Sequence, residues 1–336
     1  MPPLSKKLGK ARLLDTVVAA IRDSGWNVLY LSEDHPFQLQ MYRGDKSFRL
    51  LIYIWNITHG GGYARPADEY RIQITGVDQN QFQQMLGTKT LILGWWAESS
   101  VFAGFDVRKH SGPLGSSPSI QIRQGALELA AQTGFAPSDK ENQEIAIAFR
   151  PDFFAQYVCD LETLHDFGQS FQDFAALEAV AQEPEVNTSD LPFTNQERRV
   201  VVSAVSRKLR DAKFRKNVLT AYGYRCAFCG VALNLTDAAH IVPVTHESSV
   251  DMTYNGLALC ALHHRAFDQS LVTVWEDYAV RVSDAEEARL KAVTRGAGIE
   301  AFRQGLYPSI LLPPVVSDRP HAEFVKLGNA IRGWSA

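Results

Sequence analysis

Cysteine and histidine residues gather in one stretch of the chain, from Arg225 to Asp268. This stretch contains three of the four cysteines and four of the nine histidines. Two ligand pairs have 30 residues between them: Cys226 with Cys229, and Cys260 with His263. Two ligands on one tight turn can bind one tetrahedral ion, and a second such pair completes its coordination. The spacing predicts a structural Zn²⁺ site with three cysteines and one histidine; the alternative is three buried cysteines without a metal.

A second set of polar residues is interleaved with these pairs: His240, Asn255, His264 and Asp268. If a helix begins at 263, His264 and Asp268 share one face of it and can hold a divalent cation together. His240 can take a proton from water near pH 7, because an unperturbed imidazole has a pKa of about 6.5. Asn255 precedes a glycine and is placed to hydrogen-bond the backbone and orient His240. The set predicts metal-assisted hydrolysis of a phosphodiester.

Each of these residues also has a plainer explanation when it is taken alone. A histidine between apolar neighbours, as in A-A-H-I-V, is commonly a core residue. Asn255 can be a turn residue before Gly256, and Asp268 can be a carboxylate on a helix surface or at its cap. The interpretation of this set as a catalytic site depends on all of its residues occurring together.

The pattern C-x-x-C, A-H-I-x-P and N-G-L-A-L-C-x-x-H-H-x-x-F-D resembles the HNH endonuclease family, in its McrA-like and restriction-type branch. The resemblance covers about residues 196–282 and implies a zinc-stabilised ββα-metal fold. It implies that His240 is the general base, that Asn255 is the motif asparagine and that His264 is a ligand of the catalytic metal. The implied cofactor is Mg²⁺ or another divalent cation (Mn²⁺, Ni²⁺ or Co²⁺).

The chain departs from the family pattern at one position. Many members carry Asp or His just before the base as a further metal ligand, whereas this chain has Ala239. We take Asp268 as the substitute ligand. His246 and Asp251, in the loop that follows the base, are weaker candidates.

Basic residues are concentrated just before the first cysteine pair. Between Gln196 and Cys226 there are nine lysines and arginines against two acidic residues, although the whole chain has a net charge of −3. Such a local excess predicts contacts with the phosphates of double-stranded DNA; a solvated helical face is the alternative. The candidate DNA-binding residues are Arg207, Lys208, Arg210, Lys213, Arg215, Lys216 and Arg225.

Hydrophobic periodicity divides the chain into an α+β N-terminal domain at 1–166, a linker at 167–195 and a nuclease domain at 196–336. The first has a helix at 6–24, several alternating strands, a central strand over 48–58 that is apolar on both faces, a helix at 124–133 and another at 151–164, with a curved sheet or part-barrel as its core. Pro and Glu accumulate in the linker, where a short helix around 171–181 remains open. A basic helix at 196–221 opens the nuclease domain, and a C-terminal extension ends in a helix at 320–333.

The sequence of the N-terminal domain gives little indication of a chemical function. Its aromatic residues are either core or part of a pocket that stacks on an extruded base; they are Tyr53, Trp55, Tyr63, Tyr70, Trp95, Trp96, Phe102 and Phe105. No apolar run is long enough to span a membrane, and the first residues do not form a signal peptide. We expect a cytoplasmic protein.

Together these patterns predict a restriction or defence endonuclease whose N-terminal domain recognises DNA, including modified DNA. Cleavage of both strands would require a homodimer or paired binding events. Two alternatives remain at this point. One is an HNH effector nuclease released by an N-terminal small-molecule sensor, and the other is a zinc-stabilised DNA-binding module without catalysis.

Overall fold

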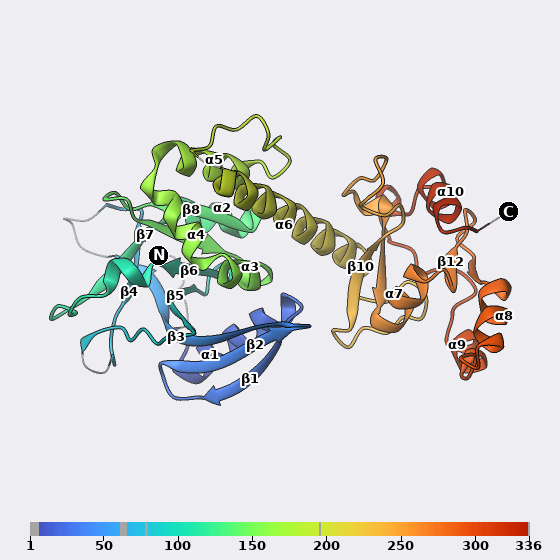
Figure 1. Cartoon of the computed structure of the whole chain (residues 1–336), viewed down its shortest axis with the longest axis horizontal. Coiled ribbons are helices and arrows are strands. Elements are labelled where there is room, and N and C mark those ends of the chain that lie inside the picture. Colours follow the sequence, from blue (N-terminus) through green and yellow to red (C-terminus); the bar gives the residue numbers. More distant parts are fainter. Residues whose placement is uncertain (1–6, 61–65, 78–79, 195, 335–336) are drawn as a thin grey trace. The chain divides into compact units, whose positions relative to one another are not determined.

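A computed structural model describes residues 7–60, 66–77, 80–194 and 196–334. The chain divides into two compact units, unit 1 (Met1–Ala212) and unit 2 (Lys213–Ala336), and each is described by itself (Figure 1). Over the described residues no helix is long and apolar enough to cross a membrane.

Unit 1 is built on one mixed sheet of nine strands. Along its main path the order is β1-β2-β3-β5-β6-β9-β8, and β4 pairs with both β3 and β7. Only the β3–β5 pair is parallel among these described strands. The strands are β1 (Asn27–Ser32), β2 (Phe37–Arg43), β3 (Lys46–His59), β4 (Glu69–Gln73), β5 (Thr88–Trp96), β6 (Val101–Phe105), β7 (Ser119–Arg123), β8 (Phe135–Asp139) and β9 (Ile145–Phe149).

Both faces of this sheet are buried. Leu50, Ile52 and Ile54 of β3 lie in one hydrophobic core, and the intervening Leu51 and Tyr53 lie in the other. Successive side chains of a strand point to opposite faces, so a strand covered on both sides is apolar throughout. The prediction of a central strand over 48–58 is confirmed.

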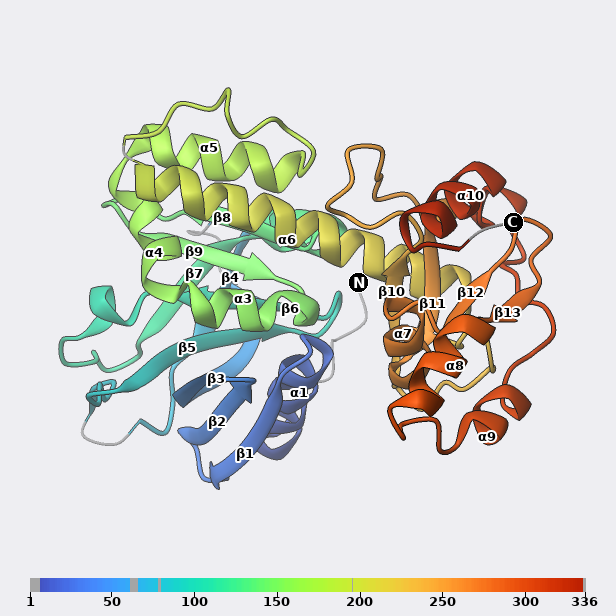
Figure 2. The ribbon, with the colours of Figure 1, turned by 45° about the vertical axis from the view of Figure 1, so that its right-hand side comes forward.

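Helices cover the two faces of the sheet unequally (Figure 2). The first core receives side chains from α1 (Lys10–Asp23), α3 (Phe154–Cys159), α4 (Leu161–Asp166) and α5 (Phe171–Gln182). The second core receives Ala126, Leu127 and Ala130 of α2 (Gln124–Thr133). Short 3₁₀ segments connect the elements: η2 (Val107–His110), η3 (Pro151–Phe153) and η4 (Phe167–Gln169).

Several elements differ from the sequence-based expectation. The predicted helix at 151–164 is divided into η3, α3 and α4, with the chain turning at Asp160 between the last two. Strands β1, β7 and β8 were not identified from the sequence. β1 lies largely exposed at the edge of the sheet and so lacks a clean alternation, and β8 contains Pro137, which is tolerated at an edge.

The described residues 167–194 of the predicted linker 167–195 contribute to unit 1. Phe167, Leu177 and Val180 are buried in its first core, and Asp173 accepts hydrogen bonds from Thr194. The division between the units falls further along, inside the helix α6 (Gln196–Ala221). The first part of α6 packs in unit 1 through Val202, Val205 and Leu209, whereas Phe214 and Val218 pack in unit 2.

Unit 2 contains a short antiparallel hairpin followed by a helix. Strand β10 (Thr236–His240) pairs with β11 (Gly256–Cys260), and the helix α7 (Ala261–Asp268) starts directly after β11. A 3₁₀ turn, η5 (Thr253–Asn255), precedes β11. The register places His240 opposite Gly256. This is the ββα arrangement that the sequence predicted.

The C-terminal extension packs back on this hairpin and on the turn that carries Cys226 and Cys229. Its elements are β12 (Val272–Val274), β13 (Val280–Val282), α8 (Asp284–Ala292), α9 (Ile299–Gln304), η6 (Val316–Asp318) and α10 (Ala322–Ile331). The Leu311 N–H donates to Ala227 O at 2.8 Å, and the Tyr307 N–H donates to Phe228 O at 2.8 Å. Ile310 and Val325 are buried in the same core as the hairpin.

Candidate metal centre and catalytic site

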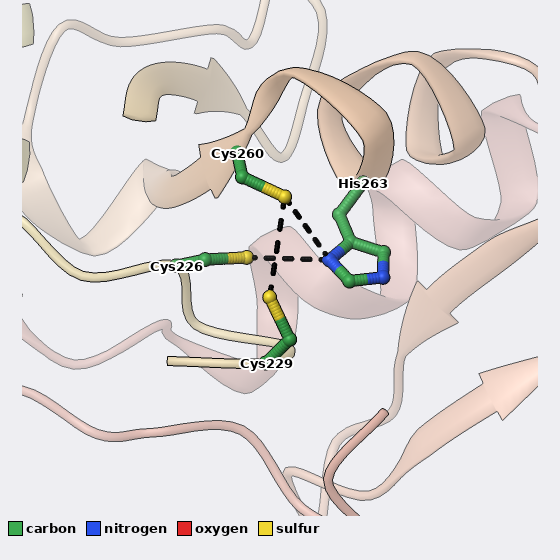
Figure 3. A group of neighbouring side chains, drawn as sticks. All are labelled: Cys226, Cys229, Cys260 and His263. Carbon is green, nitrogen blue, oxygen red and sulfur yellow. Dashed lines mark hydrogen bonds between the residues drawn. The ribbon is translucent and has the colours of Figure 1, made fainter. Parts of the chain in front are cut away.

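The two predicted ligand pairs meet at one point in unit 2 (Figure 3). The His263 Nδ1 lies 3.4 Å from Cys226 Sγ and 3.3 Å from Cys260 Sγ, and the Cys229 and Cys260 sulfurs lie 4.0 Å apart. All four ligand atoms are within 4.8 Å of one another. Tetrahedral Zn²⁺ with bonds of about 2.0–2.3 Å needs ligand atoms separated by about 3.5–3.8 Å. The four donors therefore fit one zinc ion.

Local backbone geometry presents the first ligand pair. Gly230 has φ +74°, a conformation that glycine adopts without strain, and its N–H donates to Cys226 O at 2.8 Å. A side chain at position 230 would also collide with the Tyr307 hydroxyl. The turn that brings Cys229 back toward Cys226 therefore favours glycine.

The second pair comes from the junction of β11 and α7. Cys260 ends the strand and His263 lies in the first turn of the helix, so both face the same point. Burial raises the pKa of the Cys226 thiol to about 12 and lowers the pKa of His263. Thiolates in so apolar a place need a compensating cation, and a metal ion held by the four ligands would supply one.

His240 is held from three directions at the end of β10. Its ring stacks on Phe214 of α6, with centroids 3.7 Å apart and planes 12° from parallel. Its Nε2 lies 2.9 Å from Asp251 Oδ1, and its carbonyl oxygen accepts a hydrogen bond of 3.1 Å from Arg332 Nη2. Among the described residues its Nδ1 makes no hydrogen bond. The imidazole is therefore oriented, with one nitrogen available to a water molecule.

Asn255 is fully buried and braces the loop that follows His240. Its Oδ1 accepts from the Val242 N–H at 2.8 Å, and its Nδ2 donates to Val250 O at 2.9 Å. Longer contacts of the same Nδ2 reach Ser249 Oγ and Val242 O. The side chain thus closes the loop 242–250, which delivers Asp251 to His240.

The predicted ligands of the catalytic metal lie on α7. His264 Nε2 and Asp268 Oδ2 are 3.8 Å apart, and both side chains are accessible to solvent. Two atoms at this distance can both bind one cation at about 2.1 Å. Over the part of the chain that the structure describes, the zinc set is the only cluster of three or more such ligands. His264 and Asp268 therefore form a pair that leaves most of a cation's coordination open.

The structure distinguishes the two weaker candidates for a ligand of the catalytic metal, Asp251 and His246. Asp251 contacts His240, as described above, whereas the His246 Nδ1 accepts a local hydrogen bond from the Ser248 N–H at 3.2 Å. Ala239 is buried and faces the core of the hairpin. Sequence reasoning missed Phe214 and Arg332, because neither lies in the motif and only the folded chain brings them to His240.

The predicted DNA-binding residues are divided between the units. Arg207, Lys208 and Arg210 lie in unit 1, and the other four lie in unit 2. Arg215 forms an ion pair of 2.7 Å with Asp237, and both side chains are partly exposed to solvent. Lys216 and Arg225 line a groove of about 830 Å³ in unit 2. Its other lining residues are Asn217, Thr220, Ala221, Tyr222, Gly223, Thr253, Leu311, Leu312, Pro314, Val315 and Asp318.

Most of the aromatic residues singled out in the N-terminal domain belong to its cores. Six are buried: Tyr53, Trp55, Trp95, Trp96, Phe102 and Phe105. Tyr70 is half-buried and packs edge-on against Trp96, and Tyr63 lies outside the described residues. The core interpretation is therefore confirmed for the six buried residues.

Comparison with known proteins assigns families to parts of both units. Residues 48–158 match the family described as Methylase-associated X1, and residues 226–274 match the family described as HNH endonuclease. No curated protein matches the chain. One solved structure that matches is titled "Modification dependent TagI restriction endonuclease"; it is 13% identical, with 85% of this chain and 81% of that chain covered and a TM-score of 0.29. The ββα segment with its Cys₃His cluster is an HNH endonuclease domain, and the protein is a nuclease.

Proposed function

We propose that the protein is a metal-dependent DNA endonuclease in which His240 is the general base. The observation that carries this proposal is the oriented imidazole of His240, within the segment that matches the HNH family. Asp251 accepts from the Nε2–H and holds the ring in one tautomer, so that Nδ1 takes the proton from the attacking water. The hydroxide attacks phosphorus and leaves 3′-hydroxyl and 5′-phosphate ends.

His264 and Asp268 would hold the divalent cation of the reaction, Mg²⁺, Mn²⁺, Ni²⁺ or Co²⁺. When bound, such a cation supplies positive charge that stabilises the leaving 3′ oxygen. The imidazole of His264 favours the transition metals over Mg²⁺, which prefers oxygen ligands. Asn255 acts on the reaction only through the loop that carries Asp251. The zinc cluster maintains the turn between β11 and α7.

Double-stranded DNA is the proposed substrate. Lys216 and Arg225 in the groove of unit 2, with the exposed Lys213, provide positive charge for phosphates. Phosphate contacts position a protein without reading sequence. We assign recognition, including that of modified bases, to unit 1. The match of residues 48–158 to the family described as Methylase-associated X1 lies within unit 1 and supports this assignment.

Cleavage assays with His240→Ala test the catalytic assignment. We expect wild-type protein to cut DNA in the presence of a divalent cation, and His240→Ala to bind zinc normally and cut little or nothing. His246→Ala is the matched control, because His246 lies in the adjacent loop and bonds only locally. Equal cutting by wild-type and His240→Ala protein would refute the mechanism and would favour a different base.

Digestion of matched unmodified, cytosine-methylated and hydroxymethylated DNA tests the recognition assignment. A preference for one substrate supports a modification reader in unit 1. Equal cutting of all three would exclude it. Cleavage that requires a nucleotide and ignores base modification would instead indicate a small-molecule sensor.

A further inference from the structure

The C-terminal helix α10 contacts the chain at both ends of the connection between β10 and β11. This connection carries Asp251, which contacts His240. At the start of α10, the His321 N–H donates to Tyr254 O at 3.2 Å, and the two rings stack with centroids 4.1 Å apart and planes 3° from parallel. Tyr254 immediately precedes Asn255. Just after its end, Arg332 reaches the backbone of His240 and Ile241. The helix lies outside the segment that matches the HNH family.

Arg332 makes the contacts that bear on the reaction. Its Nη2 donates to His240 O at 3.1 Å and its Nη1 donates to Ile241 O, so one guanidinium binds two successive carbonyls at the end of β10. The guanidinium also lies over the Phe267 ring of α7, 4.2 Å from its centroid. β10 pairs with β11 alone among the described strands. Arg332 therefore ties the last residues of this short strand to the helix that carries His264 and Asp268.

Close packing of α10 against the end of β10 supports the connection that Arg332 makes. Gly328 of α10 lies so near the Ile241 carbonyl that an added Cβ would collide with it. Arg332 Nη1 also donates to Gly328 O at 3.2 Å. Burial lowers the pKa of Arg332, and Asp268 opposes that shift. A half-buried guanidinium with three carbonyl acceptors and a ring beneath it is restrained enough to set the position of the backbone it binds.

We propose that Arg332 is a positioning residue for the nuclease reaction, which fixes His240 relative to His264 and Asp268. This inference rests on the proposed function of His240. A displacement of about 1 Å in a catalytic group can lower a rate by about 100-fold. The planar fork of arginine binds two carbonyls at once, whereas a lysine ammonium is a single point donor. The C-terminal extension is thereby part of the catalytic assembly.

Asn329 provides a matched control on the same helix. It is buried, its Oδ1 accepts from Thr273 Oγ1 at 2.6 Å, and its Nδ2 donates to Val274 O at 3.0 Å. These bonds anchor α10 to β12 and not to β10. Asn329→Ala therefore loosens the helix without removing the contacts to His240.

The experiment compares kcat, KM, zinc content and unfolding for Arg332→Ala, Arg332→Lys and Asn329→Ala in the full chain. We expect Arg332→Ala to lower kcat by about 10–100-fold with little change in KM or zinc content, and added guanidinium to restore part of it. Arg332→Lys should fall between wild type and Arg332→Ala, and it decides the question if the alanine variant does not fold. Asn329→Ala should unfold more easily yet keep its kcat.

Three outcomes are distinct. Unchanged kcat in both Arg332 variants, or equal losses in Asn329→Ala and Arg332→Ala, would overturn the positioning role alone. Full activity in His240→Ala would overturn the proposed function itself. Loss of kcat in the Arg332 variants, with zinc retained and guanidinium rescue, supports both.

Discussion

Replacement of Asn255 by alanine should destabilise unit 2 and slow the reaction together. Asn255 is fully buried and makes hydrogen bonds of 2.8 and 2.9 Å that close the loop 242–250. Each such bond contributes about 1 kcal/mol, and an unpaired buried N–H of Val242 costs about 1–3 kcal/mol more. We therefore expect Asn255→Ala to lower the free energy of unfolding of unit 2 by about 3–5 kcal/mol.

Denaturant unfolding and amide hydrogen exchange measure this effect. Exchange should accelerate most at the Val242 N–H, because its acceptor is removed, and kcat should fall because Asp251 is no longer held against His240. Asn255→Asp is a second informative variant: it keeps an acceptor for Val242 but turns a buried carboxylate oxygen toward Val250 O, so its loss should be at least as large. A loss below about 1 kcal/mol in Asn255→Ala, or unchanged exchange in the loop, would refute this account of the loop.

Three further predictions concern the metal, the pH and the salt. Cys226→Ser should remove about one zinc per chain, as measured by metal analysis, and unfold unit 2. The control is Cys159→Ser, in α3 and outside the cluster, which should keep its zinc. Zinc retained in Cys226→Ser would contradict the ligand set. Burial lowers the pKa of His165 to about 4. Between pH 6.5 and 4 the unfolded chain binds a proton that the folded chain does not, so the free energy of unfolding of unit 1 should fall by up to about 3 kcal/mol as the pH drops through that range. In denaturant unfolding at several pH values, His165→Gln should make this free energy depend less on pH. Combined Lys216→Ala and Arg225→Ala substitutions should reduce the slope of log affinity against log salt by about 2, and an unchanged slope would remove these two cations from the DNA interface.

Much of the site could be predicted because its ligands are close in sequence. Cys226 and Cys229 lie on one turn, and Cys260 and His263 lie at one strand-to-helix junction, so spacing alone indicated which atoms would converge. His264 and Asp268 are one helical turn apart and needed only the helix. Strand β3 was recognisable because its burial on both faces makes it apolar throughout.

Other features depend on contacts that sequence spacing does not encode. The sequence placed the end of the N-terminal domain too early, because the segment around α5 has no hydrophobic pattern clear enough to predict its packing. The burial of Leu177 and Val180 in the first core shows that α5 belongs to unit 1. The choice between Asp251 and His246 required the path of the loop that Asn255 closes.

The sequence by itself determined the nuclease motif, the Cys₃His cluster and the ββα order, because short-range geometry brings these residues together. Only the tertiary structure decided how His240 is held. Phe214 comes from a helix before the motif, and Arg332 lies 92 residues beyond His240. Such contacts form when separate elements pack into one core, and the physical reason they escape the sequence is that packing, not spacing, selects them.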